Sequence, residues 1–339
     1  MEPVSVVIPT YQRATLLPET LTSVVAGLAD DDEIIVVDDA STDSTAAVVG
    51  DMGAPWRGRV RYISLPKVGA GRAFNAGIAA ARHDLVAFAD SDDLWLPYRL
   101  ALERPLMASE RSLAYCFSNF AQLTKDGRLV PHWLVKWSND PRPWDEILAK
   151  GFHYADRWTL PPDLPSADAA FRVHIGSMYY PQLRQNYMCV NTLLVRRSVA
   201  GDALQFGVDL PRLADWECYA RLTRIGDGAY LDVDTAVQRA HSGPRLTDLG
   251  VLPFAQSRLQ IIERVWARDE AFMRQHGKDV DDLLGSTRRT IVRQLIRTNR
   301  RNEARAMLRG LRNMTVERMA LFVPHEVLAP LLKLIAPDL

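Results

Sequence analysis

Four short apolar runs divide the first hundred residues of the chain. They cover residues 4–9, 33–38, 60–65 and 85–89, and in most of them valine and isoleucine follow one another without polar alternation. Short apolar runs bounded by turn residues predict buried strands. The lack of alternation favours a sheet that is covered on both faces.

Helical periodicity fills the segments between these runs. In the segment 16–28, apolar residues recur at Leu17, Leu21, Val24 and Leu28, which places them on one face of a helix. Similar patterns cover 45–52 and 70–81. Strands that alternate with helices indicate parallel β-α-β units.

The middle of the chain is less regular. Residues 113–123 and 190–196 are predicted strands, 213–224 a helix, and 228–233 a further strand. The segment 131–182 is rich in proline, tryptophan and tyrosine. A long irregular segment of this kind is often a binding loop or lid, and aromatic packing beneath a loop is the alternative.

The pattern becomes helical throughout from about residue 250. It predicts separate amphipathic helices over 257–276, 283–299, 303–311 and 327–335. The whole pattern therefore predicts an α/β fold with a mostly parallel central sheet flanked by helices, and a C-terminal all-helical extension. We expect the α/β domain over 1–245, in two halves 1–100 and 101–245, and the extension over 250–339.

Composition is that of an ordinary globular chain, with 47% hydrophobic and 24% charged residues in 339. The net charge is zero, which gives no reason to expect a nucleic-acid partner. Residues 286–312 nevertheless carry nine arginines and one glutamate. Such a stretch suits an anionic membrane surface or an acidic partner, and a solvated helix face or a homodimer surface is the alternative.

Targeting and disulfide signals are absent from the sequence. The N-terminus lacks a basic region before its first apolar run, and no stretch reaches the roughly 18 apolar residues of a membrane span. The three cysteines are far apart and indicate neither a disulfide framework nor a zinc site. We expect a cytoplasmic protein, with a peripheral position at the inner face of the membrane as the alternative.

Polar residues follow each of the first four predicted strands at its carboxyl end. Ligands of open α/β sheets bind at that edge, so these residues together predict a cleft. The four polar segments are 10–13, 38–43, 67–72 and 90–93.

Three carboxylates, Asp90, Asp92 and Asp93, stand in the last of these segments. Neighbouring carboxylates repel one another unless a cation or protons intervene. Mn²⁺ and Mg²⁺ prefer oxygen ligands, and Mg²⁺ is usually held by one or two carboxylates plus substrate phosphates. The segment therefore predicts a metal-bound phosphorylated substrate, and a turn with capping aspartates is the alternative.

The glycines of the third segment imitate a dinucleotide-binding motif. Gly69 and Gly71 have the right spacing, but Phe74 stands where the third glycine belongs, and the motif follows the third strand. We expect these glycines to let a helix N-terminus approach a phosphate or the sheet.

Two candidates for chemistry lie later in the chain. Asp215 and Glu217 stand at the start of the helix 213–224, either to complement the helix dipole or to present a general base into the cleft. His241 follows a predicted strand, and it is either structural or a metal ligand.

These residues match a known pattern, because the chain resembles the inverting nucleotide-sugar glycosyltransferases of family 2, which have the GT-A fold. The resemblance rests on residues 4–11, 34–45, 71–78 and 88–97, and on the acidic helix that begins at Asp215. These segments span 1–245, and their combination and order are highly specific. The C-terminal helices match only the habit of many members to carry a helical tail.

The resemblance implies a role for each matching residue. Asp215 would be the catalytic base, Asp92 and His241 would hold Mn²⁺ or Mg²⁺, and Asp90 would contact the ribose or the metal. Apart from the resemblance, we expect acceptor contacts at Trp216, at Glu217 and in the aromatic segment 131–182, because sugar rings pack well on aromatic faces. The residues expected around the nucleotide are Pro9, Thr10, Tyr11, Arg13, Asp39, Gly71, Arg72, Asn75, Asp90 and Ser91.

Two positions depart from the family pattern. Members often have glutamate before the base, where this chain has Ala214, and Glu217 is the alternative base. A basic residue often lies near Asn75, where this chain has Phe74, so Arg72 or Lys67 would serve the phosphates.

The function that the resemblance implies is metal-dependent, inverting transfer of a hexosyl group from a nucleoside-diphosphate sugar, with UDP expected first. The acceptor would be a carbohydrate or glycolipid hydroxyl in polysaccharide, glycolipid or natural-product biosynthesis. The alternatives are a transferase that uses a polyprenyl-phosphate acceptor at the membrane surface, a non-catalytic sugar-nucleotide-binding protein, and a nucleotidyltransferase. A nucleotidyltransferase usually has a glycine-rich basic loop after its first strand, and residues 9–13 are not such a loop.

Overall fold

The structure is a computed structural model of the chain, and it describes residues 1–56, 58–241, 243 and 249–308. The chain forms two compact units, one of residues 1–208 and 214–242 and the other of 209–213 and 243–339. The first unit contains the sheet, and the second contains the last three described helices. Whether the units match the expected domains 1–245 and 250–339 stays a prediction.

The four strands predicted in the first hundred residues are confirmed as β1 (Val4–Thr10), β2 (Glu33–Asp39), β3 (Val60–Leu65) and β4 (Leu85–Phe88). β1 pairs in parallel with β2 and β4, and β2 pairs in parallel with β3. Their carboxyl ends therefore lie at one edge of the sheet. This edge carries the polar segments of the candidate site.

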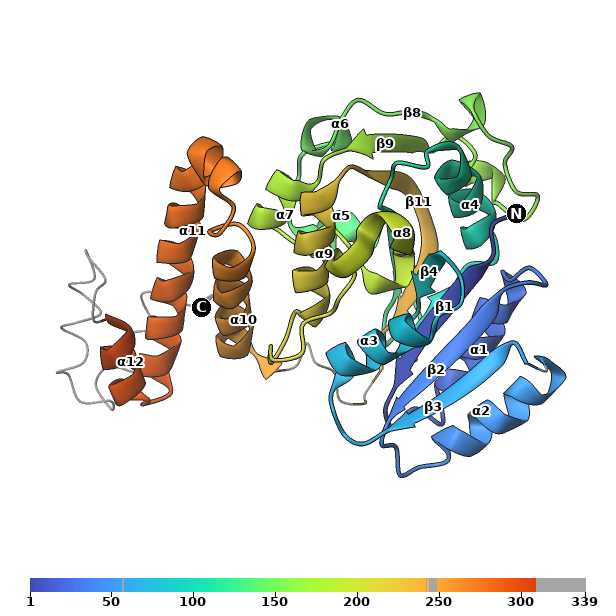
Figure 1. Ribbon diagram of the computed structural model, residues 1–339, viewed down its shortest axis with the longest axis horizontal. Coiled ribbons are helices and arrows are strands. Elements are labelled where there is room, and N and C mark those ends of the chain that lie inside the picture. Colours follow the sequence, from blue (N-terminus) through green and yellow to red (C-terminus); the bar gives the residue numbers. More distant parts are fainter. Residues whose placement is uncertain (57, 242, 244–248, 309–339) are drawn as a thin grey trace. The chain divides into compact units, whose positions relative to one another are not determined.

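Helices cover both faces of this part of the sheet (Figure 1). Val6 and Ile8 of β1 pack in one core with α1 (Leu17–Ala26) and α2 (Thr45–Gly53), whereas Val7 packs in the other with α3 (Ala70–Ala80). Successive side chains of a strand point to opposite faces, so an uninterrupted apolar strand needs a cover on each side. The predicted double cover is confirmed.

The sheet continues past β4 with mixed strand directions. Within the described residues its order is β3-β2-β1-β4-β10-β6-β11-β9-β8, with β5 beside β11 and β7 beside β6. β10 is antiparallel to β4 and β6, so it begins at the edge where β4 ends. The added strands are β5 (Leu94–Trp95), β6 (Tyr115–Leu123), β7 (Leu129–Val130), β8 (Phe152–His153), β9 (Arg172–Gly176), β10 (Leu194–Arg196) and β11 (Gly228–Arg239).

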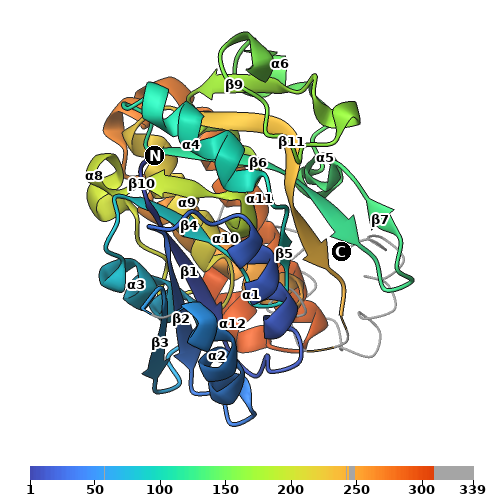
Figure 2. The ribbon, with the colours of Figure 1, turned by 90° about the vertical axis from the view of Figure 1, so that its right-hand side faces the viewer.

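Two predicted strands have the wrong length. The strand expected over 190–196 begins only at Leu194, because Val190–Thr192 forms a 3-10 turn, η4. The strand expected over 228–233 continues to Arg239 as β11, which runs beside β6 and β5 (Figure 2). Register shifts after Leu231 and Asp234 interrupt its pairing with β6, so the polar residues there look like the end of a strand.

The segment 131–182 contains short helices and strands and is not a single loop. Trp144 is only 8% exposed and stacks on Tyr230 with ring centroids 3.7 Å apart, so packing accounts for this aromatic residue. The other helices of this unit are α4 (Arg99–Ser109), α5 (Trp133–Ser138), α6 (Trp144–Ile147), α7 (Tyr179–Arg184), α8 (Arg197–Ala200) and α9 (Ala214–Ile225).

The second unit contains α10 (Val251–Arg264), α11 (Glu270–Arg297) and α12 (Arg301–Leu308). The helix expected over 257–276 is wrong, because the chain turns after Arg264 and Asp269 caps a new helix by accepting from the Phe272 amide at 3.1 Å. The expected helix 327–335 and the end of 303–311 lie outside the described residues. In the described part of the chain, no helix is long and apolar enough to cross a membrane.

Candidate functional site

Residues 89–93 form a loop that we call the carboxylate loop, and it connects β4 to β5. Ser91 and Asp93 are buried in it, while Asp90 and Asp92 are half-buried. The loop is fixed to α1, because the Thr20 hydroxyl donates to the Ser91 carbonyl at 3.2 Å. The predicted aspartates are therefore held at the carboxyl edge of the sheet.

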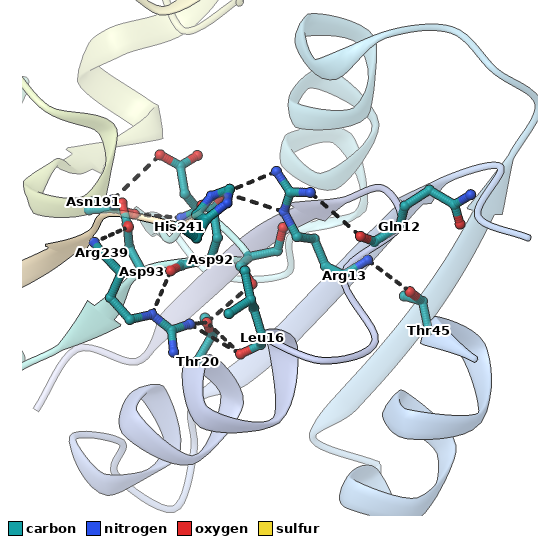
Figure 3. Close-up of polar contacts among 12 residues, drawn as sticks. Gln12, Arg13, Leu16, Thr20, Thr45, Asp92, Asp93, Asn191, Arg239 and His241 are labelled. Atoms are coloured by element: carbon teal, nitrogen blue, oxygen red, sulfur yellow. Dashed lines mark hydrogen bonds and ion pairs between the residues drawn. The ribbon is translucent and has the colours of Figure 1, made fainter. Parts of the chain in front are cut away.

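One oxygen of Asp92 joins three separate segments of the chain. Asp92 Oδ2 lies 3.1 Å from Nη2 and 3.3 Å from Nε of Arg13, and 2.9 Å from His241 Nε2 (Figure 3). The side chains of Arg13, Asp92 and His241 are 15%, 17% and 10% exposed. The structure thus brings together three of the residues predicted for the site.

Arg13 is presented to Asp92 by a loop that is itself anchored. Gln12 has a left-handed backbone with φ of 53°, and its amide donates to the Ser41 hydroxyl at 2.8 Å. The Arg13 amide donates to the Thr45 hydroxyl at 3.2 Å (Figure 3). The loops after β1 and β2 therefore hold each other in place.

Arg239, which the sequence analysis missed, supports the carboxylate loop. Its amide donates to Asp93 Oδ1 at 2.8 Å, and its guanidinium donates to the Asp92 carbonyl at 2.6 Å and to the Leu16 carbonyl at 3.1 Å (Figure 3). It also pairs with Glu19. Nothing in its sequence context distinguishes it from an ordinary arginine at the end of a strand.

The expected nucleotide edge is built from the ends of β1 and β2. Asp39 is 4% exposed and accepts from the amides of Val68 and Gly69 at 2.6 and 3.1 Å. Its carboxylate also lies 2.9 Å from Lys67 Nζ, and this ammonium stands over the exposed ring of Tyr11. The structure therefore places Asp39, Tyr11 and Lys67 together.

Pro9 and Thr10 end β1 beside this group. Thr10 is 3% exposed, and among the described residues its hydroxyl has no hydrogen-bond partner. A buried hydroxyl without a partner costs free energy, so the position suits a ligand or water that would accept from it or donate to it.

Two residues predicted to contact the nucleotide have contacts within the protein. A Cβ at Gly71 would overlap the Gly207 carbonyl oxygen, so only glycine fits there. The Asn75 carboxamide donates to the Phe206 carbonyl at 2.9 Å and accepts from the Phe206 amide at 2.8 Å. These residues join α3 to the segment before α9, and their nucleotide contact stays a prediction. Arg72, on the same helix, is exposed.

Asp215 is the second residue of α9 and is half-buried. The negative charge of Asp215 acts on the same buried group, the Cys189 thiol, as the charges of the carboxylate loop do. Burial raises the pKa of the Cys189 thiol well above its usual value, and the negative charges of Asp90, Asp93 and Asp215 add to this effect. The negative charges of Asp215 and of the carboxylate loop thus act on the same buried thiol.

The two expected acceptor residues are buried. Trp216 is 2% exposed, and its indole donates to the Gln182 carbonyl at 3.1 Å. Glu217 is 3% exposed and lies 3.1 Å from Arg221 on the next turn of the helix. These contacts anchor α9, so acceptor contact at either residue stays a prediction.

The site has the chemistry of a partial metal centre. Asp92 offers carboxylate oxygens, which suit Mn²⁺ and Mg²⁺, and His241 offers an imidazole nitrogen, which is a ligand of divalent transition metals. Among the described residues, no group of three or more His, Cys, Asp or Glu is arranged to hold a metal alone. Such a donor set fits a metal whose coordination is completed by substrate phosphates.

The α/β sheet, with a carboxylate loop after its fourth strand, has the GT-A fold. Residues 5–172, about half of the chain, match the family model described as glycosyl transferase family 2, so this part of the chain is a family 2 glycosyltransferase domain. The predicted fold class and family are thereby confirmed.

Curated relatives match over a limited part of the chain. An uncharacterised glycosyltransferase of Nostoc sp. is 40% identical over 97 residues, which are 29% of this chain and 30% of that protein. The succinoglycan biosynthesis protein ExoW of Rhizobium meliloti is 38% identical over 103 residues, or 30% and 32% of the two chains. A putative teichuronic acid biosynthesis glycosyltransferase, TuaG of Bacillus subtilis, is 33% identical over 125 residues, or 37% and 49%. The match thus spans at most about half the length of these proteins.

Solved structures match over more of the chain. S. aureus TarS 1-349 in complex with UDP-GlcNAc superposes with a TM-score of 0.59 and 17% identity, covering 91% of this chain and 88% of that one. The mannosyltransferase PcManGT from Pyrobaculum calidifontis, in complex with GDP-Man and Mn²⁺, gives a TM-score of 0.52 at 16% identity, covering 96% and 83%. At these identities the likeness establishes the fold.

Proposed function

We propose that this glycosyltransferase moves a hexosyl group from a nucleoside-diphosphate sugar to an acceptor hydroxyl, with inversion at the anomeric carbon and with a divalent metal bound. The observation that carries the proposal is the meeting of Arg13, Asp92 and His241 at the carboxyl edge of the sheet. That group combines a cation for phosphates with two metal-ligating side chains.

The donor would lie along the edge formed by β1, β2 and β4. Asp39 and Tyr11 would hold the nucleoside, and the Thr10 hydroxyl would form a hydrogen bond with it. Arg13 would donate to diphosphate oxygens, because a guanidinium binds phosphate through paired hydrogen bonds. We propose UDP as the more favoured nucleotide of the donor and GDP as the second, since similar structures hold UDP-GlcNAc and GDP-Man.

Asp92 and His241 would hold Mn²⁺ or Mg²⁺, with Asp90 beside them. A metal held there supplies positive charge that stabilises the leaving diphosphate. Asp215 would take the proton from the acceptor hydroxyl as its oxygen attacks the anomeric carbon from the side opposite the diphosphate. One displacement of this kind inverts the configuration and needs no covalent intermediate on the protein.

The acceptor is proposed to be a carbohydrate in the synthesis of a surface or secreted polysaccharide. The relatives named for succinoglycan and teichuronic acid biosynthesis support this class of acceptor. The membrane-surface alternative rests on the basic segment 286–312, part of which lies outside the described residues.

A thermal-shift series tests the proposal. UDP and GDP are each added at saturation with Mn²⁺, with Mg²⁺, and with a chelator. A ligand that binds only the folded protein at about 100 times its Kd adds roughly 2.7 kcal/mol of stability, so a clear rise in Tm is expected with one nucleotide and metal. No response to any nucleotide with either metal would reject the proposal.

A further inference from the structure

Asn191 is a buried polar residue that the catalytic proposal does not use. It lies in η4, immediately before β10, and is 1% exposed. Because β10 runs antiparallel to β4, the residues before β10 arrive at the edge where the carboxylate loop begins. Asn191 thereby meets Asp90, which is 101 residues earlier in the sequence.

The carboxamide of Asn191 contacts the loop at three points. Its oxygen accepts from the Asp90 amide at 2.5 Å, and its nitrogen lies 3.4 Å from Asp90 Oδ2. The same nitrogen donates to Asp93 Oδ2 (Figure 3). One side chain therefore fixes the backbone at Asp90 and the direction of two carboxylates.

The backbone of Asn191 is fixed as firmly as its side chain. Arg99, which is fully buried, donates to the Asn191 carbonyl at 2.5 Å, to the Phe88 carbonyl at 3.1 Å and to the Leu193 carbonyl at 2.9 Å. Its guanidinium also lies 3.1 Å from the carboxylate of Glu103. Arg99 thus ties η4 to the last residue of β4, and Asn191 cannot shift independently of the loop.

The chemistry of an amide suits this position. Two carboxylates that share one neighbour repel each other, and a donor between them offsets the repulsion. A lysine or arginine would also neutralise them and would compete with a metal. Asn191 offers donor and acceptor groups and adds no charge of its own beside Asp90 and Asp93.

We propose that Asn191 is a positioning residue that orients Asp90 and Asp93 so that the adjoining Asp92–His241 pair binds a divalent metal with the donor diphosphate. This inference rests on the proposed function, which supplies the metal and the diphosphate. In this proposal, Asn191 affects the affinity of the site for the metal and does not act only through the stability of the fold.

The test measures Mn²⁺ affinity of the whole chain with saturating UDP or GDP, whichever binds, from the electron paramagnetic resonance signal of free Mn²⁺. Asn191→Ala removes all three contacts, and Asn191→Ser removes the paired geometry with less loss of polarity. We expect both variants to bind Mn²⁺ about 10- to 100-fold more weakly, an effect of the size seen when the groups that orient metal ligands are lost, because Asn191 holds the residues on either side of Asp92. Nucleotide binding in chelator should change little.

Thr192→Val is the matched control. Thr192 is equally buried on the same turn, and its hydroxyl donates to the Cys189 backbone carbonyl at 3.0 Å and not to a carboxylate. We expect this variant to keep the Mn²⁺ affinity of the wild type even if its Tm falls. Circular dichroism verifies that each variant is folded, and Asn191→Ser carries the test if Asn191→Ala does not fold.

The outcomes separate the two proposals. Wild-type Mn²⁺ affinity in a folded Asn191 variant overturns the positioning role and leaves the proposed function intact. An equal loss of Mn²⁺ affinity in Thr192→Val also overturns it, because the effect would then be general packing. If the wild-type protein itself binds no Mn²⁺ with either nucleotide, the metal-dependent function fails, and this inference fails with it.

Discussion

Asp215 stands close enough to the carboxylate loop for its charge to act on the same buried thiol, Cys189, as Asp90 and Asp93 do. Its position on the first turn of α9 leaves it half-buried, while the following Trp216 and Glu217 are buried. Of the two carboxylates considered as base, Asp215 is therefore the more accessible to an acceptor, because Glu217 is 3% exposed.

The variant Asp215→Asn keeps the shape of the side chain and removes its basicity. We expect kcat to fall about 10²- to 10⁴-fold, the usual contribution of a general base. The Tm shift with nucleotide and metal should remain, since Asp215 is not proposed to hold the donor. Steady-state kinetics measures the first and thermal shift the second. Activity equal to that of the wild type would remove Asp215 from the mechanism.

The sequence predicts some residues of the candidate site and not others. Asp90 and Asp92 could be found because carboxylates directly follow an apolar run, and His241 because it follows a later strand. Asn191 and Arg239 could not, because each acts through a partner that is 100 or more residues distant. Hydrogen bonds between such residues depend on strand order and direction, which apolar patterns do not specify.

At the scale of elements, α3 lies unusually close to the sheet. A Cβ at Gly77 would stand 3.2 Å from Val37 Cγ2 and would overlap Val7 Cγ1, so glycine permits this approach. The closeness matters to the site because α3 also carries Gly71 and Asn75, which hold the segment before α9.

Gly77→Ala should therefore destabilise the fold by about 1–3 kcal/mol, because the added methyl overpacks the core. Gly50→Ala is the matched control, since Gly50 lies in α2 and a methyl group added there would have no atom within 4 Å. That control should be stabilised by about 0.5–1 kcal/mol through helix propensity. Urea denaturation measures both, and equal midpoints for the two variants would contradict the packing.

Element predictions succeed where the hydrophobic period is regular. β1 to β4 and α1 to α3 appear within a few residues of their predicted ends. The predictions fail at β11, where register shifts disturb the alternation, and at the break between α10 and α11, where Asp269 as a cap outweighs a continuous helical pattern. The antiparallel direction of β10 has no local signal at all.

For the molecule as a whole, acid stability depends on carboxylates that arginines hold. Arg196 is 4% exposed and lies 2.5 Å from Glu2 and 3.3 Å from Asp84. Its hydrogen bond lowers the pKa of Glu2. Burial opposes ionisation of Asp84, but hydrogen bonds from Ser198 and Arg196 outweigh it, so the pKa of Asp84 is also lowered.

A carboxyl group whose pKa is lower in the folded than in the unfolded chain stabilises the folded state at pH values above its unfolded-state pKa. This stabilisation is lost as the pH falls through the pKa of the folded state. We expect the contribution to be complete above about pH 4.5 and lost below it. Arg196→Met should lower Tm at pH 7 and should flatten the further loss of Tm between about pH 5 and pH 3. Arg111→Met is the control, because Arg111 is exposed and 3.8 Å from the same Glu2. Parallel pH profiles for wild type and Arg196→Met would contradict this.

The wide spacing of the site residues along the chain has a consequence for biosynthesis. Asp92 meets Arg13 across 79 residues and His241 across 149, and Arg239 meets Glu19 across 220. During translation, β1 to β4 can pair long before the last of these partners leaves the ribosome. The emerging chain therefore holds a partly formed sheet whose acidic loop lacks its contacts with Arg239 and His241 until the segment around residue 240 has been made.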